Sequence, residues 1–313
     1  MTTRKLNLAL LVCDTPKPEV LEKYGDYPTM FTNVFKRANE QKVDITWQYF
    51  DVVEKQEYPD LRDLADNRTF DGIVISGSAA SAYTDLPWIL KLVQFVHKLR
   101  AEPYRSQVKL VGICFGHQII ARACGGSCEK NPNGWEFGLI PVYLTPMGKH
   151  YLKTDKVFTV KYIHDGHEKK RDYTMTNDVE DDDEKEVNQV HQDHVKDLPP
   201  GFHSLATTAP HTPIHSLLSD DNQCITVQGH PEFVRQVVRI LLTLRRDAGI
   251  VPKDYANEQL EKLDKEPAND DDDEWMVSKF IDFILGELPK VPKDHIDLTT
   301  GQAFGNNILI GND

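Results

Sequence analysis

The residue best suited to nucleophilic chemistry is Cys114, which lies within the sequence Gly-Ile-Cys-Phe-Gly at 112–116. An apolar stretch at 108–113 predicts a buried strand, and a helical pattern follows the motif. A strand, a tight turn and a helix are the setting of a nucleophile elbow. Gly112 and Gly116 flank the cysteine because such a turn leaves no space for Cβ atoms. The turn would place the Cys114 sulfur at the start of a helix, whose dipole favours the thiolate.

A second segment, His-Pro-Glu at 230–232, follows another apolar strand at 224–227. A thiolate nucleophile needs a base that takes its proton and later protonates the leaving amine. It also needs a carboxylate that holds the imidazole in the right tautomer. His230 and Glu232 can supply both functions, and Pro231 fixes φ between them.

Together, the two segments resemble the class I glutamine amidotransferase family, whose triad is Cys, His and Glu on a doubly wound α/β sheet. The resemblance covers roughly residues 6–248. It implies that Cys114 is the nucleophile, His230 the general acid/base and Glu232 the orienting carboxylate.

The oxyanion formed by such a nucleophile needs two hydrogen-bond donors. The elbow aims the Phe115 N–H at the place where this oxyanion would form. The sequence Ile-Ser-Gly-Ser at 75–78 follows the third predicted strand, where the family has its oxyanion loop. The resemblance therefore implies that the Gly77 N–H is the second donor.

Other positions resemble the part of the family that holds the glutamyl group of the substrate. Gln118 stands four residues after the nucleophile, and Gly-Trp-Glu-Phe-Gly at 134–138 resembles the segment that lines the glutamine pocket. The stretch at 191–194 resembles a loop at the pocket edge in relatives of the GMP synthase glutaminase domain. The residues expected to bind substrate are therefore Gln118, Ser78, Trp135, Glu136 and His191.

Short β-rich apolar runs alternate with longer helical patterns along the chain. Strands are predicted at 6–12, 45–52, 72–75, 108–113, 139–144, 157–163 and 224–227, and helices at 29–39, 87–99 and 232–248. This alternation is typical of a doubly wound, mostly parallel α/β sheet of the flavodoxin-like kind. Ligands of such sheets bind at the carboxyl ends of the strands, where both motifs stand.

Composition predicts one amidotransferase-like domain at 1–250 and a C-terminal extension at 251–313. An almost wholly polar segment at about 168–186 is expected to be a solvated acidic insertion, because like charges cannot be buried together. A second acidic run at 270–274 precedes one amphipathic helix, whose positive dipole end it would stabilise. These two runs hold most of the net negative charge.

Charge and cysteine content exclude several classes of protein. The formal net charge of −13 argues against nucleic-acid binding, which depends on clustered Lys and Arg. The longest apolar run, at 6–13, is too short to span a membrane. Five dispersed cysteines do not form a disulfide framework, so we expect a cytoplasmic protein.

No cofactor or metal is expected from the sequence. The chain has no P-loop and no Gly-x-Gly-x-x-Gly after a strand. The His-x-x-His pairs at 164–167 and 191–194 have no carboxylate or cysteine at a spacing that completes a zinc set.

The implied reaction is attack of Cys114 on the γ-glutamyl amide of glutamine or of a γ-glutamyl peptide. The residues after 248 are too few for an ATP-using synthetase. The chain is therefore either a free-standing hydrolase or a glutaminase subunit that serves a synthetase in trans. A non-catalytic partner-binding relative is a third hypothesis, and the presence of all three triad residues argues against it. Stress-response cysteine hydrolases share the core but lack the His-Pro-Glu segment.

Overall fold

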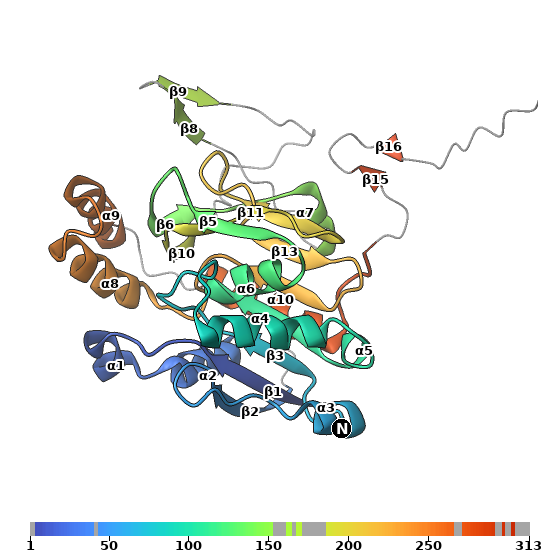
Figure 1. Cartoon of the computed structure of the whole chain (residues 1–313). Helices are drawn as coiled ribbons and strands as arrows, with labels where there is room; N and C mark the ends of the chain where they lie inside the picture. Colours follow the sequence, from blue (N-terminus) through green and yellow to red (C-terminus); the bar gives the residue numbers. More distant parts are fainter. Residues whose placement is uncertain are drawn as a thin grey trace, which may run out of the picture.

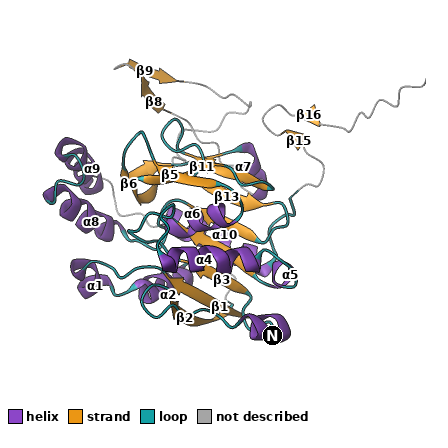
Figure 2. Cartoon of the chain, viewed as in Figure 1, coloured by secondary structure: helices purple, strands orange, loops and turns teal. Residues whose placement is uncertain are grey.

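The computed structural model describes residues 4–40, 43–152, 161–164, 167–170, 186–265, 271–291, 296–297 and 302–303. The predicted acidic insertion lies mostly outside these residues, and so does most of the chain beyond 291. The described chain forms an α/β structure whose sheet is covered by helices on both faces (Figures 1 and 2).

An eight-stranded sheet forms the centre of the described chain. Its strands are β1 (Lys5–Val12), β2 (Asp44–Asp51), β3 (Gly72–Ile75), β4 (Lys109–Ile113), β7 (Tyr143–Leu144), β12 (Phe202–Thr207), β13 (Ser216–Ser219) and β14 (Cys224–Val227). They run in the order β2-β1-β3-β4-β14-β13-β12-β7. The first five are parallel to one another, and β13, β12 and β7 continue the sheet by antiparallel pairing. The predicted doubly wound, mostly parallel sheet is confirmed.

Shorter antiparallel pairs lie beside this sheet in the described chain. They are β6 (Glu136–Pro141) with β10 (Glu186–His191), β5 (Ser127–Lys130) with β11 (Asp193–Asp197), β8 (Lys161–His164) with β9 (His167–Lys170), and β15 (Ile296–Asp297) with β16 (Gln302–Ala303).

The described helices are α1 (Pro18–Tyr24), α2 (Tyr27–Arg37), α3 (Leu61–Asn67), α4 (Pro87–Leu99), α5 (Tyr104–Gln107), α6 (Phe115–Ala123), α7 (Pro146–Tyr151), α8 (Arg235–Asp247), α9 (Lys253–Lys265) and α10 (Asp271–Leu285). Among them none is long and apolar enough to cross a bilayer.

Successive residues of a strand point to opposite faces of the sheet, and β1 shows how this divides the core. Leu8 and Leu10 belong to an apolar cluster with α2, α8 and α10. Ala9 and Leu11 belong to another cluster with α3, α4 and α6. Because β1 is covered on both faces, its sequence is a nearly continuous apolar run.

The C-terminal region contains two described helices rather than the single one expected. Met276, Phe280 and Ile284 of α10 are buried in the same apolar cluster as β1 and α2. Leu263 of α9 is also buried there. The predicted division at residue 250 stays a prediction, but both helices pack on the core.

Candidate active site

Cys114 alone forms the turn between β4 and α6. Its φ of 50° and ψ of −103° lie outside the regions that most residues adopt. A Cβ at Gly112 would lie 2.6 Å from the Gly116 carbonyl oxygen, and one at Gly116 would lie 2.3 Å from the Ile75 carbonyl oxygen. No side chain fits at such distances, so the predicted reason for both glycines is confirmed.

His230 and Glu232 follow β14, which pairs with β4 in the sheet. The Nδ1 atom of His230 lies 2.8 Å from Oε1 of Glu232. Cys114 lies close enough to the imidazole for its charge to raise the pKa of that ring. Phe233 stacks on the imidazole with 4.3 Å between ring centroids. The structure therefore brings the three predicted triad residues together, and Glu232 and Phe233 fix the position of the ring.

The environment of His230 favours its protonated form. Burial by itself lowers the pKa of the imidazole, but the negative charges of Cys114 and Glu232 outweigh burial and raise that pKa to about 10. A protonated imidazole beside the sulfur can stabilise a thiolate and later donate a proton to a leaving group.

The loop after β3 lies directly against these groups. A Cβ at Gly77 would lie 2.7 Å from Cε1 of His230 and 3.7 Å from Cβ of Cys114, so the Gly77 backbone must be next to both. Within the described chain, neither the Gly77 N–H nor the Phe115 N–H has a hydrogen-bond acceptor. Both donors therefore remain available to an oxyanion.

Side chains from two strands hold this loop in place. Ser76 Oγ accepts from the Cys13 N–H at 2.9 Å and donates to the Gly77 carbonyl at 3.0 Å. Asp14, at the end of β1, accepts from the Ala79 N–H at 2.7 Å. Ser78, predicted to bind substrate, accepts from the Ala80 N–H at 3.1 Å, so in this structure it stabilises the turn.

Gln118 lies behind the nucleophile and is only 2% exposed. Its Nε2 donates to the Asp193 carbonyl at 3.0 Å and to Oε1 of Gln228 at 3.1 Å. Gln228 in turn donates to the Cys114 sulfur at 3.5 Å. The structure thus connects Gln118 to the nucleophile through Gln228, and the predicted contact of Gln118 with substrate stays a prediction.

Trp135 is half-buried and contacts a cation that the sequence did not reveal. The guanidinium carbon of Arg245, from α8, lies 4.8 Å from the Trp135 ring centroid and 5.7 Å from that of Phe137. Burial lowers the pKa of Arg245, while Cys114, Tyr27 and Asp14 oppose that shift through their charges. The guanidinium therefore lies against the two aromatic rings of the segment at 135–137.

Glu136 and His191 lie together, but neither is open to solvent. Their exposed fractions are 3% and 4%, and Oε2 of Glu136 lies 3.1 Å from Nε2 of His191. His215, fully buried, lies next to them. Burial raises the pKa of Glu136, but the neighbouring histidines outweigh it and lower that pKa to about 2. Their predicted contact with substrate is neither supported nor excluded by these positions.

A buried chain of hydrogen bonds links α10 to His230. Asp273, only 4% exposed, accepts from Nδ2 of Asn188 at 2.7 Å. Nδ2 of Asn188 also donates to the Phe233 carbonyl at 2.9 Å, and the Asn188 carbonyl accepts from the His230 N–H at 2.9 Å. The second acidic run is therefore more than a solvated surface segment, because one of its aspartates supports the position of His230.

Comparison with known proteins agrees with this geometry. The family model described as glutamine amidotransferase class-I matches residues 26–262. The chain belongs to the class I glutamine amidotransferase family. A glutamine amidotransferase-like protein of Schizosaccharomyces pombe is 30% identical over 89% of this chain and 98% of its own length. Gamma-glutamyl peptidase 4 of Arabidopsis thaliana is 30% identical over 83% of this chain and 89% of its own length.

Solved structures of this amidotransferase family share the fold. A glutamine amidotransferase from Methylobacillus flagellatus superimposes with a TM-score of 0.57 at 17% identity, over 94% of this chain and all but 1% of its own. One from Thermotoga maritima gives a TM-score of 0.55 at 16% identity, over 91% of this chain and 99% of its own. At such identities the likeness concerns the fold alone.

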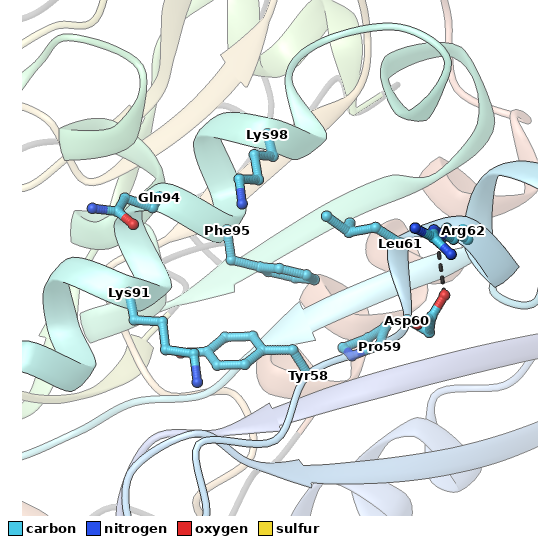
Figure 3. A pocket seen from close by; sticks show the side chains of 9 residues that line it. All are labelled: Tyr58, Pro59, Asp60, Leu61, Arg62, Lys91, Gln94, Phe95 and Lys98. Atoms are coloured by element: carbon cyan, nitrogen blue, oxygen red, sulfur yellow. Dashed lines mark hydrogen bonds between the residues drawn. The ribbon is translucent and has the colours of Figure 1, made fainter.

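An open depression elsewhere on this amidotransferase-family chain has a volume of about 450 Å³ (Figure 3). Tyr58, Leu61 and Phe95 line its apolar part, and Lys91 and Lys98 lie at its edge. It shares no lining residue with the triad or with the predicted substrate-binding residues. It is therefore not part of the candidate active site of this family member.

Several residues of the amidotransferase site were not predicted from the sequence: Asp14, Asn188, His215, Gln228, Phe233, Arg245 and Asp273. Asp14 and Gln228 directly follow buried strands, so the rule that ligands bind at the carboxyl ends of strands could have found them. Nothing near Arg245 or Asp273 distinguishes them from ordinary surface charges of a helix.

Proposed function

We propose that this chain is a cysteine hydrolase that cleaves the γ-glutamyl amide of a γ-glutamyl peptide or of glutamine through a thioester on Cys114. The observation that carries the proposal is the buried line from Cys114 through His230 to Glu232, formed at a strained turn. Membership of the amidotransferase family supports it, because hydrolysis of such amides is the shared chemistry.

The geometry supports a two-step reaction. The Cys114 thiolate attacks the γ-carbonyl carbon, and the N–H groups of Gly77 and Phe115 stabilise the oxyanion. The His230 imidazolium donates a proton to the amine nitrogen as the C–N bond breaks, which leaves a thioester. Neutral His230 then takes a proton from a water molecule as the water oxygen attacks the thioester. The acid product leaves and loses its remaining proton to solvent, and the Cys114 thiolate and the His230 imidazolium are restored. Glu232 keeps the ring oriented throughout.

Arg245 supports a γ-glutamyl peptide over free glutamine as substrate. It lies against the Trp135 and Phe137 rings, and among the described residues no carboxylate pairs with it. A guanidinium held by aromatic rings is suited to bind a carboxylate, and a peptide substrate adds one at its C-terminus. Relatives named gamma-glutamyl peptidases cover most of this chain, which agrees with this preference.

Replacing Arg245 by Met should therefore raise KM for a γ-glutamyl peptide by about 10- to 100-fold, because one charge-assisted contact to substrate is lost. Methionine keeps much of the apolar contact with Trp135, so kcat should change less than KM. Steady-state kinetics with glutathione and with a γ-glutamyl anilide, which lacks the extra carboxylate, will measure this. The matched control is Arg246→Met, since Arg246 is the next residue of α8 and pairs with Asp247. Equal effects on both substrates would show that Arg245 does not bind the second carboxylate.

The proposed function is tested by offering the purified chain glutamine, glutathione and the γ-glutamyl anilide, and by measuring glutamate release. We expect turnover of at least one of them, with the peptide preferred. A preference for glutamine that rises when a synthetase is added would favour a glutaminase subunit acting in trans. No turnover of any substrate, together with no labelling of Cys114 by an electrophilic glutamine analogue, would leave the proposal without support.

A further inference from the structure

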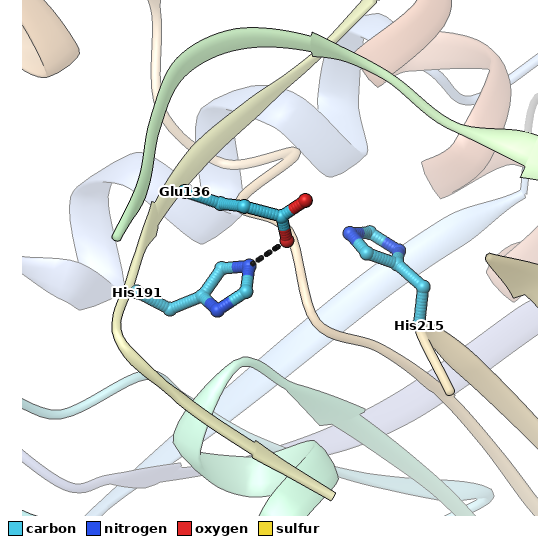
Figure 4. Close-up of side chains that lie close together, drawn as sticks. All are labelled: Glu136, His191 and His215. Carbon is cyan, nitrogen blue, oxygen red and sulfur yellow. Dashed lines mark ion pairs between the residues drawn. The ribbon is translucent and has the colours of Figure 1, made fainter. Parts of the chain in front are cut away.

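Glu136, His191 and His215 form a buried cluster that the proposed reaction does not use. They come from the start of β6, the end of β10 and the residue before β13. One ligand atom of each lies within 4.8 Å of the others, and the exposed fractions of these residues are 3%, 4% and 0% (Figure 4). Three side chains that can bind metals thus converge from segments far apart in the sequence.

The hydrogen bonds of His191 determine which of its atoms faces the cluster. Its Nδ1 lies 3.2 Å from the Asp193 carbonyl oxygen, which can only accept, so Nδ1 carries a proton. In the neutral ring Nε2 then presents a lone pair, 3.1 Å from a carboxylate oxygen of Glu136. Two lone pairs at that distance repel each other unless a cation, either a proton or a metal ion, lies between them. A backbone carbonyl on the outer nitrogen is also the usual arrangement for a histidine that binds a metal.

The ring of His215 is also unpaired within the described chain. Neither ring nitrogen has a hydrogen-bond partner in the described chain, although the residue is fully buried. Leaving a buried polar group unpaired costs about 1–3 kcal/mol. Figure 4 shows one of these nitrogens directed toward the Glu136 carboxylate and the His191 ring. A metal ion at that point would accept the lone pair.

Two neighbouring residues fix the position of the Glu136 carboxylate. Thr212 donates to Oε2 of Glu136 at 2.7 Å, and Nδ1 of His211 lies 3.5 Å from Oε1. His211 is the partly exposed member of this group, with 25% of its side chain accessible. These contacts fix the Glu136 carboxylate beside His191 and His215.

We propose that Glu136, His191 and His215 bind one divalent transition-metal ion, with zinc the best match for two imidazoles and one carboxylate. Ligand atoms of a tetrahedral zinc site stand ~3.3 Å apart, so the cluster needs only small side-chain movements to close. The ion would link β6, β10 and β13. It would also support the backbone behind the nucleophile, because the His215 carbonyl accepts from the N–H of Gln228, which contacts Cys114.

The sequence predicted no metal from the spacing of the His-x-x-His pairs alone. The pair at 191–194 has no suitable neighbour in sequence, but the fold brings Glu136 and His215 to His191. His194 does not take part, since its Nε2 faces Glu129 at 3.9 Å. The other predicted pair, at 164–167, has side chains outside the described residues.

Zinc binding is tested on the full chain with Cys114→Ala, so that a Cys–His pair at the active site cannot bind the metal. After treatment with a chelator, the protein is titrated with Zn²⁺ and with Co²⁺. We expect one equivalent to bind, a rise in melting temperature, and visible Co²⁺ absorption with histidine ligands. His215→Gln and Glu136→Gln should each weaken the affinity at least about 100-fold.

The control is His203→Gln, which changes an exposed histidine paired with Asp220 and should leave metal affinity unchanged. The proposal is overturned if the parent binds no stoichiometric metal, or if both cluster variants bind it as tightly as the parent. In the first case a proton shared by His191 and Glu136 holds the cluster, which NMR of the ring nitrogens would show. Because the parent is already inactive by design, failure here says nothing against the proposed hydrolysis.

Discussion

Replacing Cys114 by Ala should reduce the release of glutamate from any γ-glutamyl substrate by at least about 10⁴-fold, because it removes the thiol beside His230 that forms the thioester. The variant keeps the backbone of the elbow, so the fold and the binding of substrate should persist. Rapid-quench mass spectrometry of the wild type should show a γ-glutamyl adduct on Cys114, and the same measurement on the variant should show none.

The matched control for this prediction is Cys124→Ala. Cys124 stands at the other end of α6, and burial raises the pKa of its thiol to about 11, with Arg100 partly opposing that shift. It is therefore protonated at neutral pH and should not react. A loss of activity in Cys124→Ala equal to that in Cys114→Ala, or an adduct on any other cysteine, would contradict the assignment of the nucleophile.

Replacing Glu232 by Gln should lower kcat/KM by about 10³- to 10⁴-fold, because the amide neither stabilises the charged imidazolium nor fixes the tautomer of the neutral ring. The variant should also change the pH dependence. In the wild type the charge of Glu232 helps to raise the pKa of His230 from 6.5 to about 10, so imidazolium persists until the pH approaches that value. Without that charge, the alkaline limb of the pH profile should move to lower pH.

The raised pKa of His230 also predicts how the stability of the fold depends on pH. A histidine whose pKa is higher in the folded chain stabilises the fold fully below its unfolded pKa, here 6.5, and this contribution disappears as the pH rises toward 10. Urea unfolding of the wild type and of Glu232→Gln should be measured between pH 6.5 and pH 10. The difference between their free energies of unfolding should shrink as the pH rises. Glu274→Gln, which removes an exposed partner of Arg37, is the control. An unshifted alkaline limb together with nearly normal turnover would exclude the proposed role of Glu232.

The elements that the sequence predicted most accurately are those with a strong local pattern. The strands at 72–75 and 224–227 and the helix at 87–99 have the predicted bounds, because buried runs with strand or helix periodicity are bounded by polar residues. The helix expected to begin at Glu232 instead begins at Arg235. The residues predicted to form its first turn make other contacts, because Glu232 pairs with His230 and Phe233 stacks on the imidazole.

Antiparallel strands β12 and β13 were not predicted. Their sequences mix polar and apolar residues, and what makes them strands is pairing with a neighbour in the sheet. Whether such a segment forms a strand depends on its neighbours in the sheet rather than on the strand propensity of its residues.

The sequence by itself determined the elbow at Cys114 and the neighbouring strand end that carries His230 and Glu232, the residues to which we assign the reaction. Each lies within a few residues of the strand end that positions it, so a local pattern contains the necessary geometry. Only the tertiary structure decided that Asp273 supports His230, that Arg245 lies on Trp135, and that Glu136 and His215 join His191. Those contacts connect segments separated by tens of residues, and they arise from packing and sheet pairing, which local periodicity does not specify.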